Sequence, residues 1–275
     1  MMSKNTFFDL HRFINLCRKE MVEGWKVNLL RMLLMYGALT VFFIFMGFND
    51  YERATTLMKD PVVEGSLRVF LVAGCIYGCI SASLIMERMK TKAGRFSFLM
   101  LPATSFEKYV ARWLVFTVVF VVAYLVAFEL ADYTRVVVCS LSFPDVKGIT
   151  PTSLRLLFLW NDGNEIVYQS ASDVLISVCS YLFLQSFFVL GSTVWPKNAF
   201  LKTFATGLGL FFTFLFISTL LVKALMQGST NVNWNFNLLD AENVYVASCI
   251  FFVLALFNWI LAYYRFKESE IINRM

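Results

Sequence analysis

The sequence predicts an all-α polytopic membrane protein with six transmembrane helices, both termini in the cytoplasm and an interfacial amphipathic helix at the amino terminus. Of the 275 residues, 59% are hydrophobic and only 16% are charged, whereas soluble domains carry roughly 25% charged residues. The apolar residues gather in stretches of about 18 to 23, long enough to cross a hydrocarbon layer of roughly 30 Å. The length fits one membrane domain, 1–275, without an additional soluble catalytic domain of roughly 100 residues.

Residues 6–26 are expected to form the interfacial helix. Their apolar side chains recur three or four positions apart, and charged side chains occupy the other faces. Thr6 and Asp9 have the spacing that starts a capping box. The polar face is rich in Arg and Lys, which favours a helix lying in the cytoplasmic interface. An ordinary juxtamembrane segment is the alternative.

Six apolar stretches follow, and each is expected to be one transmembrane helix. They are Leu29–Phe48, Leu67–Met86, Trp113–Ala131, Val174–Val194, Phe204–Leu225 and Val244–Tyr264.

Three connections are expected on the outer side, at 49–66, 132–173 and 226–243. The long loop 132–173 should be ordered, because Val136–Leu141 is β-branched and Leu154–Trp160 is apolar. In the third loop, apolar residues alternate with asparagines from Val232 to Leu238, which predicts one dry face. That face either packs over the outer end of the transmembrane helices or rests on lipid headgroups.

The orientation follows from the basic residues. Of the 24 Lys and Arg residues, 17 lie in the amino-terminal segment, at Arg31 near the start of the first span, in the connections 87–112 and 195–203, and at the carboxyl end. Since cytoplasmic loops carry the excess of Lys and Arg, both termini should lie in the cytoplasm of a multi-pass protein of the inner (plasma) membrane. The net charge of +5 is therefore explained by basic residues that orient the protein in the bilayer, and nucleic acid is not an expected partner.

The composition argues against an enzyme. The sequence has no HExxH, no GxSxG and no paired acidic motif within the spans, and His11 is its only histidine. We therefore expect no catalytic residues, no cofactor and no metal site. A P-loop of the form GxxxxGK[ST] is also missing from the sequence, so any ATP-driven work requires a separate ATPase.

A few polar and small residues inside the spans are candidates for packing or transport. Gln185 falls midway along the fourth span and Asn258 in the inner half of the sixth. Buried amides of this kind join helices or line a substrate pathway, and both alternatives stay open. Gly74, Gly78 and Ala82 recur every four residues, which predicts close approach by another helix of this chain or of a second subunit.

The connection 87–112 combines charge with a short apolar stretch. Phe96–Leu101 is expected to form a short helix ended by Pro102. Thr104 or Ser105 should then cap the next helix, with Glu107 in its favourable first turn. Such a segment presents a small apolar knob to the cytosol. The alternative is a basic connector that lies on anionic lipid.

This connection resembles the second cytoplasmic segment of exporter-type ABC transporter permeases, the type-2 permease family. The resemblance rests on Glu87, Leu101-Pro102-Ala103-Thr104-Ser105, Glu107-Lys108-Tyr109 and Arg112. Three further segments are similar to segments of uncharacterised bacterial permease-like proteins, namely Gly191-Ser192-Thr193-Val194, Lys197–Thr203 and Tyr263–Glu268. The layout of amino-terminal helix and six spans is shared. The Gly-Thr that the family carries after the first acidic residue is replaced here by Lys90-Thr91-Lys92-Ala93-Gly94.

The resemblance implies a membrane-spanning permease subunit that pairs with ATP-binding cassette subunits and with a second permease subunit, as a homodimer or heterodimer. It also implies that Phe96–Ser105 transmits ATPase closure to the spans. Phe98 is the expected anchor in a groove of the ATPase, because aromatic residues dominate interface energies. The expected coupling residues are Glu87, Arg95, Phe96, Phe98, Leu101, Pro102, Glu107 and Lys108. The alternative function is a non-catalytic membrane interaction or anchoring protein.

Overall fold

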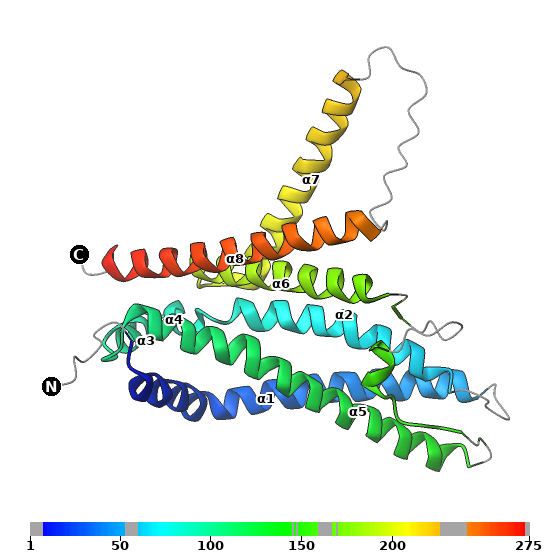
Figure 1. Ribbon diagram of the computed structural model, residues 1–275. Helices are drawn as coiled ribbons and strands as arrows, with labels where there is room; N and C mark the ends of the chain where they lie inside the picture. Colours follow the sequence, from blue (N-terminus) through cyan, green and yellow to red (C-terminus); the bar gives the residue numbers. More distant parts are fainter. Residues whose placement is uncertain are drawn as a thin grey trace. The chain divides into compact units, whose positions relative to one another are not determined.

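Helices account for all the regular structure that the computed structural model describes (Figure 1). The described residues are 8–52, 60–144, 146, 148–158, 167–168, 170–225 and 241–272. Six helical segments among them are long and apolar enough to cross a membrane, which confirms an α-helical multi-pass membrane protein. The expected pattern in the third outer loop, from Val232 to Leu238, lies outside the described residues, as does Thr6.

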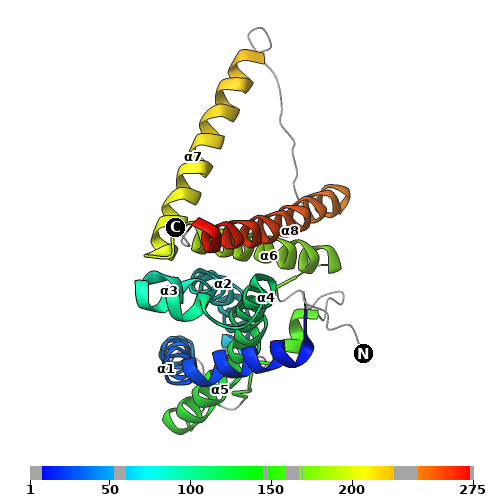
Figure 2. The same ribbon diagram turned by 90° about the vertical axis from the view of Figure 1, so that its left-hand side faces the viewer.

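Helix α1 spans Leu10–Tyr51, 42 residues in one continuous helix, where the sequence predicts an interfacial helix followed by a separate span. Asp9 is its N-cap, and the Asp9 carboxylate accepts hydrogen bonds from the backbone amides of His11 at 2.9 Å and Arg12 at 3.3 Å. In Figure 2 the first turns of α1 run across the direction of the rest of the helix, which is seen end-on.

The second span is α2, Val62–Ser83, and the third is built from α4, Ser105–Leu114, η2, Val115–Val119, and α5, Phe120–Ser142. The segment η2 is one π-helical turn, in which the backbone hydrogen-bond pattern shifts and can leave a carbonyl group for another donor. The Ser81 hydroxyl donates to the Phe116 carbonyl at 2.7 Å and so joins α2 to this turn.

Helix α5 continues to Ser142, so the expected boundary of the loop 132–173 is wrong. The apolar stretch Trp113–Ala131 stops at the charged residues Asp132 and Arg135, but these two lie one turn apart in α5 and pair with each other at 2.8 Å. The helix therefore carries its charges inward and continues. Val136–Leu141 is helical, and the ordered part of the connection beyond it includes the 3-10 turn η3, Leu154–Phe158.

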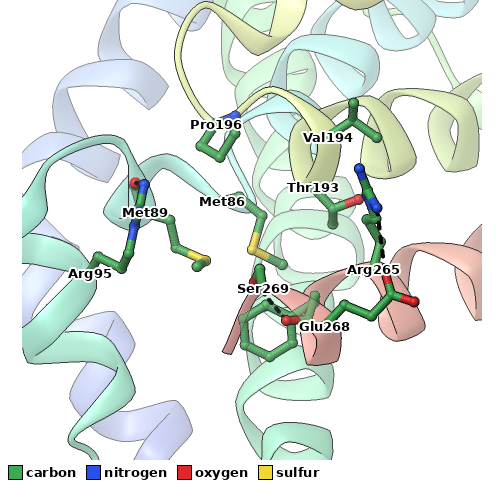
Figure 3. Close-up of a pocket in the computed structure, with 10 residues that line it drawn as sticks. Met86, Met89, Arg95, Thr193, Val194, Pro196, Arg265, Glu268 and Ser269 are labelled. Carbon is green, nitrogen blue, oxygen red and sulfur yellow. Dashed lines mark hydrogen bonds and ion pairs between the residues drawn. The ribbon is translucent and has the colours of Figure 1, made fainter. Parts of the chain in front are cut away.

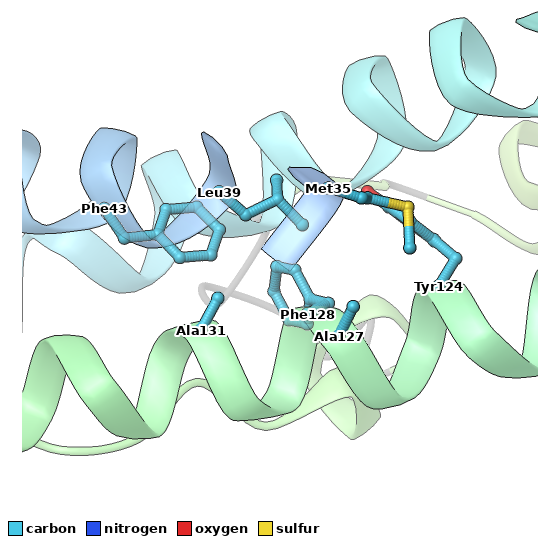
Figure 4. Close-up of a cluster of buried hydrophobic side chains, with 7 residues drawn as sticks. All are labelled: Met35, Leu39, Phe43, Tyr124, Ala127, Phe128 and Ala131. Carbon is cyan, nitrogen blue, oxygen red and sulfur yellow. The ribbon is translucent and has the colours of Figure 1, made fainter. Parts of the chain in front are cut away.

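Aromatic side chains form the core between α1, α2 and α5. Phe43 and Phe128 are fully buried, with ring centroids 5.4 Å apart in an edge-to-face arrangement. Figure 4 shows these two rings with Met35, Leu39, Tyr124, Ala127 and Ala131 between α1 and α5. Phe70 of α2 adds a ring 4.8 Å from that of Phe128, so one cluster holds three spans together.

The remaining elements are η1, Glu87–Lys90, α3, Lys92–Leu99, α6, Ala171–Val194, α7, Ala199–Leu225, and α8, Ala241–Ile272. Helix α8 packs along α6, with the rings of Phe251 and Phe183 stacked at 5.6 Å. Helix α7 contacts α6 near its start and then diverges from α6 and α8 (Figures 1 and 2).

The chain forms two compact units. The first comprises Met1–Ser81 and Pro102–Val174, and the second comprises Ala82–Leu101 and Leu175–Met275. The chain therefore leaves the first unit near the end of α2, contributes η1 and α3 to the second, and returns at Pro102. Residues 82–101, which include most of the expected coupling residues, are therefore covalently joined to the first unit at both ends.

Candidate functional site

The short helix α3 lies inside the connection 87–112. The Thr91 hydroxyl caps it by accepting a hydrogen bond from the Gly94 amide at 3.2 Å, and the helix ends at Leu99 ahead of Pro102. The sequence predicts a helix over Phe96–Leu101, so its existence is confirmed, while its start lies one turn earlier. The helix begins early because Thr91 caps a first turn formed by Lys92–Arg95.

Helix α3 is amphipathic, and its two phenylalanines point in opposite directions. Phe98 is only 2% exposed and packs against Phe266 of α8, with ring centroids 6.0 Å apart. Phe96 is 62% exposed and Met100 is 83% exposed. The structure thus corrects the expectation that Phe98 is the anchor presented to a partner, because its ring is already used inside the second unit. Phe96 and Met100 are the apolar groups available at this surface.

Glu107 begins α4 and ties it to the amino-terminal part of α1. The capping box with Thr104 is present, with Thr104 N donating to Glu107 at 3.0 Å. The same carboxylate accepts from Arg12 Nε at 2.8 Å and Arg12 Nη2 at 2.7 Å, and from Asp9 N at 2.8 Å. Glu107 is fully buried, so this residue fastens two segments of the first unit rather than presenting its charge to a partner.

A second ion pair joins the same helices further along. Arg112 of α4 lies 4.0 Å from Glu20 of α1, with both side chains buried, and its guanidinium sits over the Phe116 ring at 5.4 Å. The sequence gives Arg112 only as part of the family-like segment. The Arg112–Glu20 pair forms only because α1 packs against α4, and the sequence pattern does not indicate that packing.

The other expected coupling residues are divided between the two units. Lys108 is buried, Pro102 is exposed and Leu101 is partly buried. Glu87 belongs to η1 and is partly buried. Arg95 lines a pocket of the second unit. Glu87, Arg95, Phe96, Phe98 and Leu101 thus belong to the second unit, and Pro102, Glu107 and Lys108 belong to the first.

The pocket encloses about 220 Å³ between η1, α3 and the ends of α6 and α8 (Figure 3). Its lining is Met86, Met89, Arg95, Thr193, Val194, Pro196, Arg265, Phe266, Glu268 and Ser269. Arg265 pairs with Glu268 at 3.3 Å, and both side chains are more than half exposed. The pocket thus combines an apolar wall with two guanidinium groups and one carboxylate.

The small-residue face of α2 packs within the chain at Gly74. A Cβ atom at this position would lie 3.0 Å from the Tyr124 ring of α5, and the Tyr124 hydroxyl donates to the Phe70 carbonyl at 2.7 Å. The helix that approaches Gly74 is therefore α5. Gly78 and Ala82 are buried.

The two amides predicted within the spans are both buried. The Asn258 side chain donates to Ser186 Oγ at 3.1 Å and so links α8 to α6. Gln185, the residue before that serine, is 2% exposed. For Asn258 this contact matches an interhelical polar bond, one of the two alternatives that the sequence leaves open.

A buried ionic network in the first unit is absent from the sequence-based predictions. Arg135 of α5 is fully buried and donates to Asp132 at 2.8 Å and to Asp60 at 3.3 Å. It also donates to the Tyr51 hydroxyl and, at 2.9 Å, to the Thr150 carbonyl. The i, i+3 spacing of Asp132 and Arg135 is the one signal that points to it, provided that the helix is known to continue.

The two carboxylates also hold the chain that follows α5. Asp132 accepts from Thr152 N at 2.6 Å, and Asp60 accepts from Thr150 N at 3.1 Å. The network therefore fastens the connection after α5 to the ends of α1, α2 and α5. Each charge is buried with several hydrogen-bond partners, as a buried ion pair requires.

No protein family model matches the chain. No curated protein matches it, and no solved structure matches it.

Proposed function

We propose that the chain is the membrane-spanning permease subunit of an ABC-type exporter, which moves its substrate with ATP hydrolysed by a separate subunit. The observation that carries the proposal is helix α3, a short amphipathic helix between two spans, whose Phe98 faces α8 while Phe96 and Met100 face outward. By the positive-inside rule this helix lies on the cytoplasmic side, where an ATPase subunit would bind.

The connections of α3 suit a transmitting element. Its inner face packs on Phe266 of α8, and its ends lead covalently to α2 and α4. A displacement of α3 by a partner would therefore act on helices of both units. An ATP-bound partner needs to prefer one of two helix arrangements by only a few kcal/mol to shift their populations.

We include a second permease subunit in the proposal, and α7 is the element that supports it. No residue from Phe204 to Leu221 of α7 is buried within the chain, whereas Ala199 and Thr203 near its start are. A Cβ atom at Gly209 would have no atom within 4 Å, so this helix can be approached closely at that position.

The ATPase contact can be tested by copurification. Phe96→Asp and Met100→Asp should keep the protein folded and weaken association with an ATP-binding cassette subunit by about 2 kcal/mol or more, because a charge replaces a buried apolar contact in the complex. Phe158→Asp is the matched control, since Phe158 is 60% exposed on the expected outer side. Equal retention of the ATPase by all three variants would contradict the role of α3. Failure of the wild-type protein to retain a P-loop ATPase would favour the interaction-protein alternative.

A further inference from the structure

The first turns of α1 are fastened to α4 by one of their faces. On that face Leu16 and Glu20 are buried, and the Glu20 carboxylate lies 4.0 Å from the Arg112 guanidinium of α4. Arg12 adds its two hydrogen bonds to Glu107 at the start of α4. These contacts fix the directions in which the other faces of this helical segment point.

A second face of the same turns is apolar and open. Its members follow one another at intervals of four, seven and four positions, which keeps them on one side of a helix. They are Leu10, Ile14, Met21 and Trp25, which are between 49% and 63% exposed and are called the open stripe below. Four large apolar side chains that the described chain leaves half exposed in one row mark a surface for a partner or for lipid.

The place of the open stripe along α1 indicates lipid. Helix α1 is continuous from Leu10 to Tyr51, and Trp25 lies one turn before Leu29, where the first expected span begins. Figure 2 shows the first turns running across the direction of the rest of α1, so a membrane that the rest of α1 crosses has the first turns along its surface. The open stripe is therefore at the boundary between lipid and water, where tryptophan side chains are enriched.

A third face carries basic side chains. Arg18 and Lys26 are exposed and form no ion pair within the part of the chain that the structure describes, whereas Lys19 pairs with Glu23 at 3.5 Å. Two positive charges are therefore in excess on this face. Anionic lipids give the cytoplasmic leaflet a negative surface potential, which attracts Lys and Arg side chains beside a span. A helix with one apolar face and a basic face next to it is typical of binding to such a surface.

We infer that the first turns of α1 bind an anionic lipid surface, with the open stripe inserted among the acyl chains and with Arg18 and Lys26 against lipid phosphate groups. Since another face of these turns holds α4, the lipid surface and α4 are joined through one helical segment. The start of α4 is thereby held at the membrane surface. The inference concerns lipid binding alone and stands independently of the proposed transport function.

A fluorophore at two neighbouring positions tests the insertion. In a cysteine-free background, Ile14→Cys lies in the open stripe, and Asn15→Cys lies on the exposed polar side of the same turn. Each full-length variant is labelled and reconstituted into vesicles of phosphatidylcholine and phosphatidylglycerol. The label at position 14 should be quenched by lipids brominated in their acyl chains and shielded from iodide, since interfacial helices insert about 5 to 10 Å into the headgroup and acyl boundary. The label at position 15 should show the reverse.

Two results would overturn the insertion. Strong iodide quenching at both positions would place the open stripe in water. Shielding of position 14 from both quenchers would mean that protein covers the stripe. If the Ile14→Cys protein does not fold, Met21→Cys in the same stripe makes the same test.

The basic face is tested with the label at position 14 and two brominated lipids. Brominated phosphatidylglycerol should quench this label more than brominated phosphatidylcholine does. Arg18→Gln combined with Lys26→Gln should lower that preference about fivefold or more, because each basic side chain near an anionic surface strengthens its binding by about this factor. Arg155→Gln, at an exposed position of η3, is the matched control and should leave the preference unchanged. Equal quenching by the two lipids without these changes, or an unchanged preference in the double variant, would overturn the role of the basic face.

Discussion

Arg12 holds Glu107 through two hydrogen bonds, from Nε at 2.8 Å and from Nη2 at 2.7 Å. The two residues are 95 positions apart, so this fork joins the start of α1 to the start of α4. The rings of Phe8 and Phe106, 6.5 Å apart, add an apolar contact beside it. The amino-terminal turns of α1 are thereby fixed to the helix that follows the α3 segment.

The first prediction concerns this pair. Arg12→Gln and Glu107→Gln should each lower the melting temperature in detergent, and the double variant should lose less than the sum, because both changes remove one interaction. Arg18→Gln, an exposed change on the same helix, should leave the melting temperature within error of wild type. Strict additivity of the two single variants would show that the pair is not coupled.

The buried network predicts a large effect at Arg135. Arg135→Leu should destabilise the protein by about 3 to 5 kcal/mol, because Asp60 and Asp132 would keep buried carboxylates without their cation. Arg155→Gln, on the exposed surface of η3, is the control and should cost less than about 0.5 kcal/mol. Unfolding in denaturant, followed by tryptophan fluorescence, measures both. A loss below about 1 kcal/mol for Arg135→Leu would contradict the network's structural role.

Substitution of Gly74 on α2, with Gly209 on α7 as the control, tests the packing of α2. Gly74→Leu should destabilise the protein by about 1 to 3 kcal/mol, because the new side chain meets the Tyr124 ring. Gly209→Leu on α7 should be tolerated, since a Cβ atom there has no atom within 4 Å. Thermal unfolding of the two variants in detergent compares them directly. Similar melting temperatures would mean that α5 can move away from Gly74.

The orientation can be tested by labelling with a membrane-impermeant thiol reagent in a cysteine-free background. Native Cys139 is unsuitable as the outer reporter because it is fully buried beside Gly47. Ser153→Cys, at an exposed position before η3, should react in intact cells. Arg18→Cys should react only after the cells are permeabilised, because the positive-inside rule places it in the cytoplasm. The reverse pattern would overturn the predicted topology.

The proposed second permease subunit can be tested at Gly209. In the same cysteine-free background, Gly209→Cys should form an intermolecular disulfide on mild oxidation if two copies meet along α7, because the position is open. Val122→Cys, exposed on α5, is the matched control and should stay monomeric. Equal crosslinking of both variants would indicate random collision. A monomeric Gly209→Cys protein would count against a homodimer through this face.

Features that depend on a short stretch of chain were predictable from sequence. The six apolar stretches indicate six spans, because bilayer thickness sets the length of each one. The cap ahead of Glu107, for which the sequence offers Thr104 or Ser105, and the short helix before Pro102 also depend on residues a few positions apart. In each case the hydrogen bonds or the burial that define the element are local.

Tertiary structure alone decided which side chains face inward and which distant charges meet. Helix α3 has only eight residues and carries apolar groups on more than one face, so its pattern does not tell whether Phe96 or Phe98 is covered; packing against α8 selects Phe98. The partners Arg135 and Asp60 lie 75 positions apart and meet only because α1, α2 and α5 pack together. A buried charge is stable only beside its partner, and a linear sequence does not show which residues the fold brings within a few ångströms of each other.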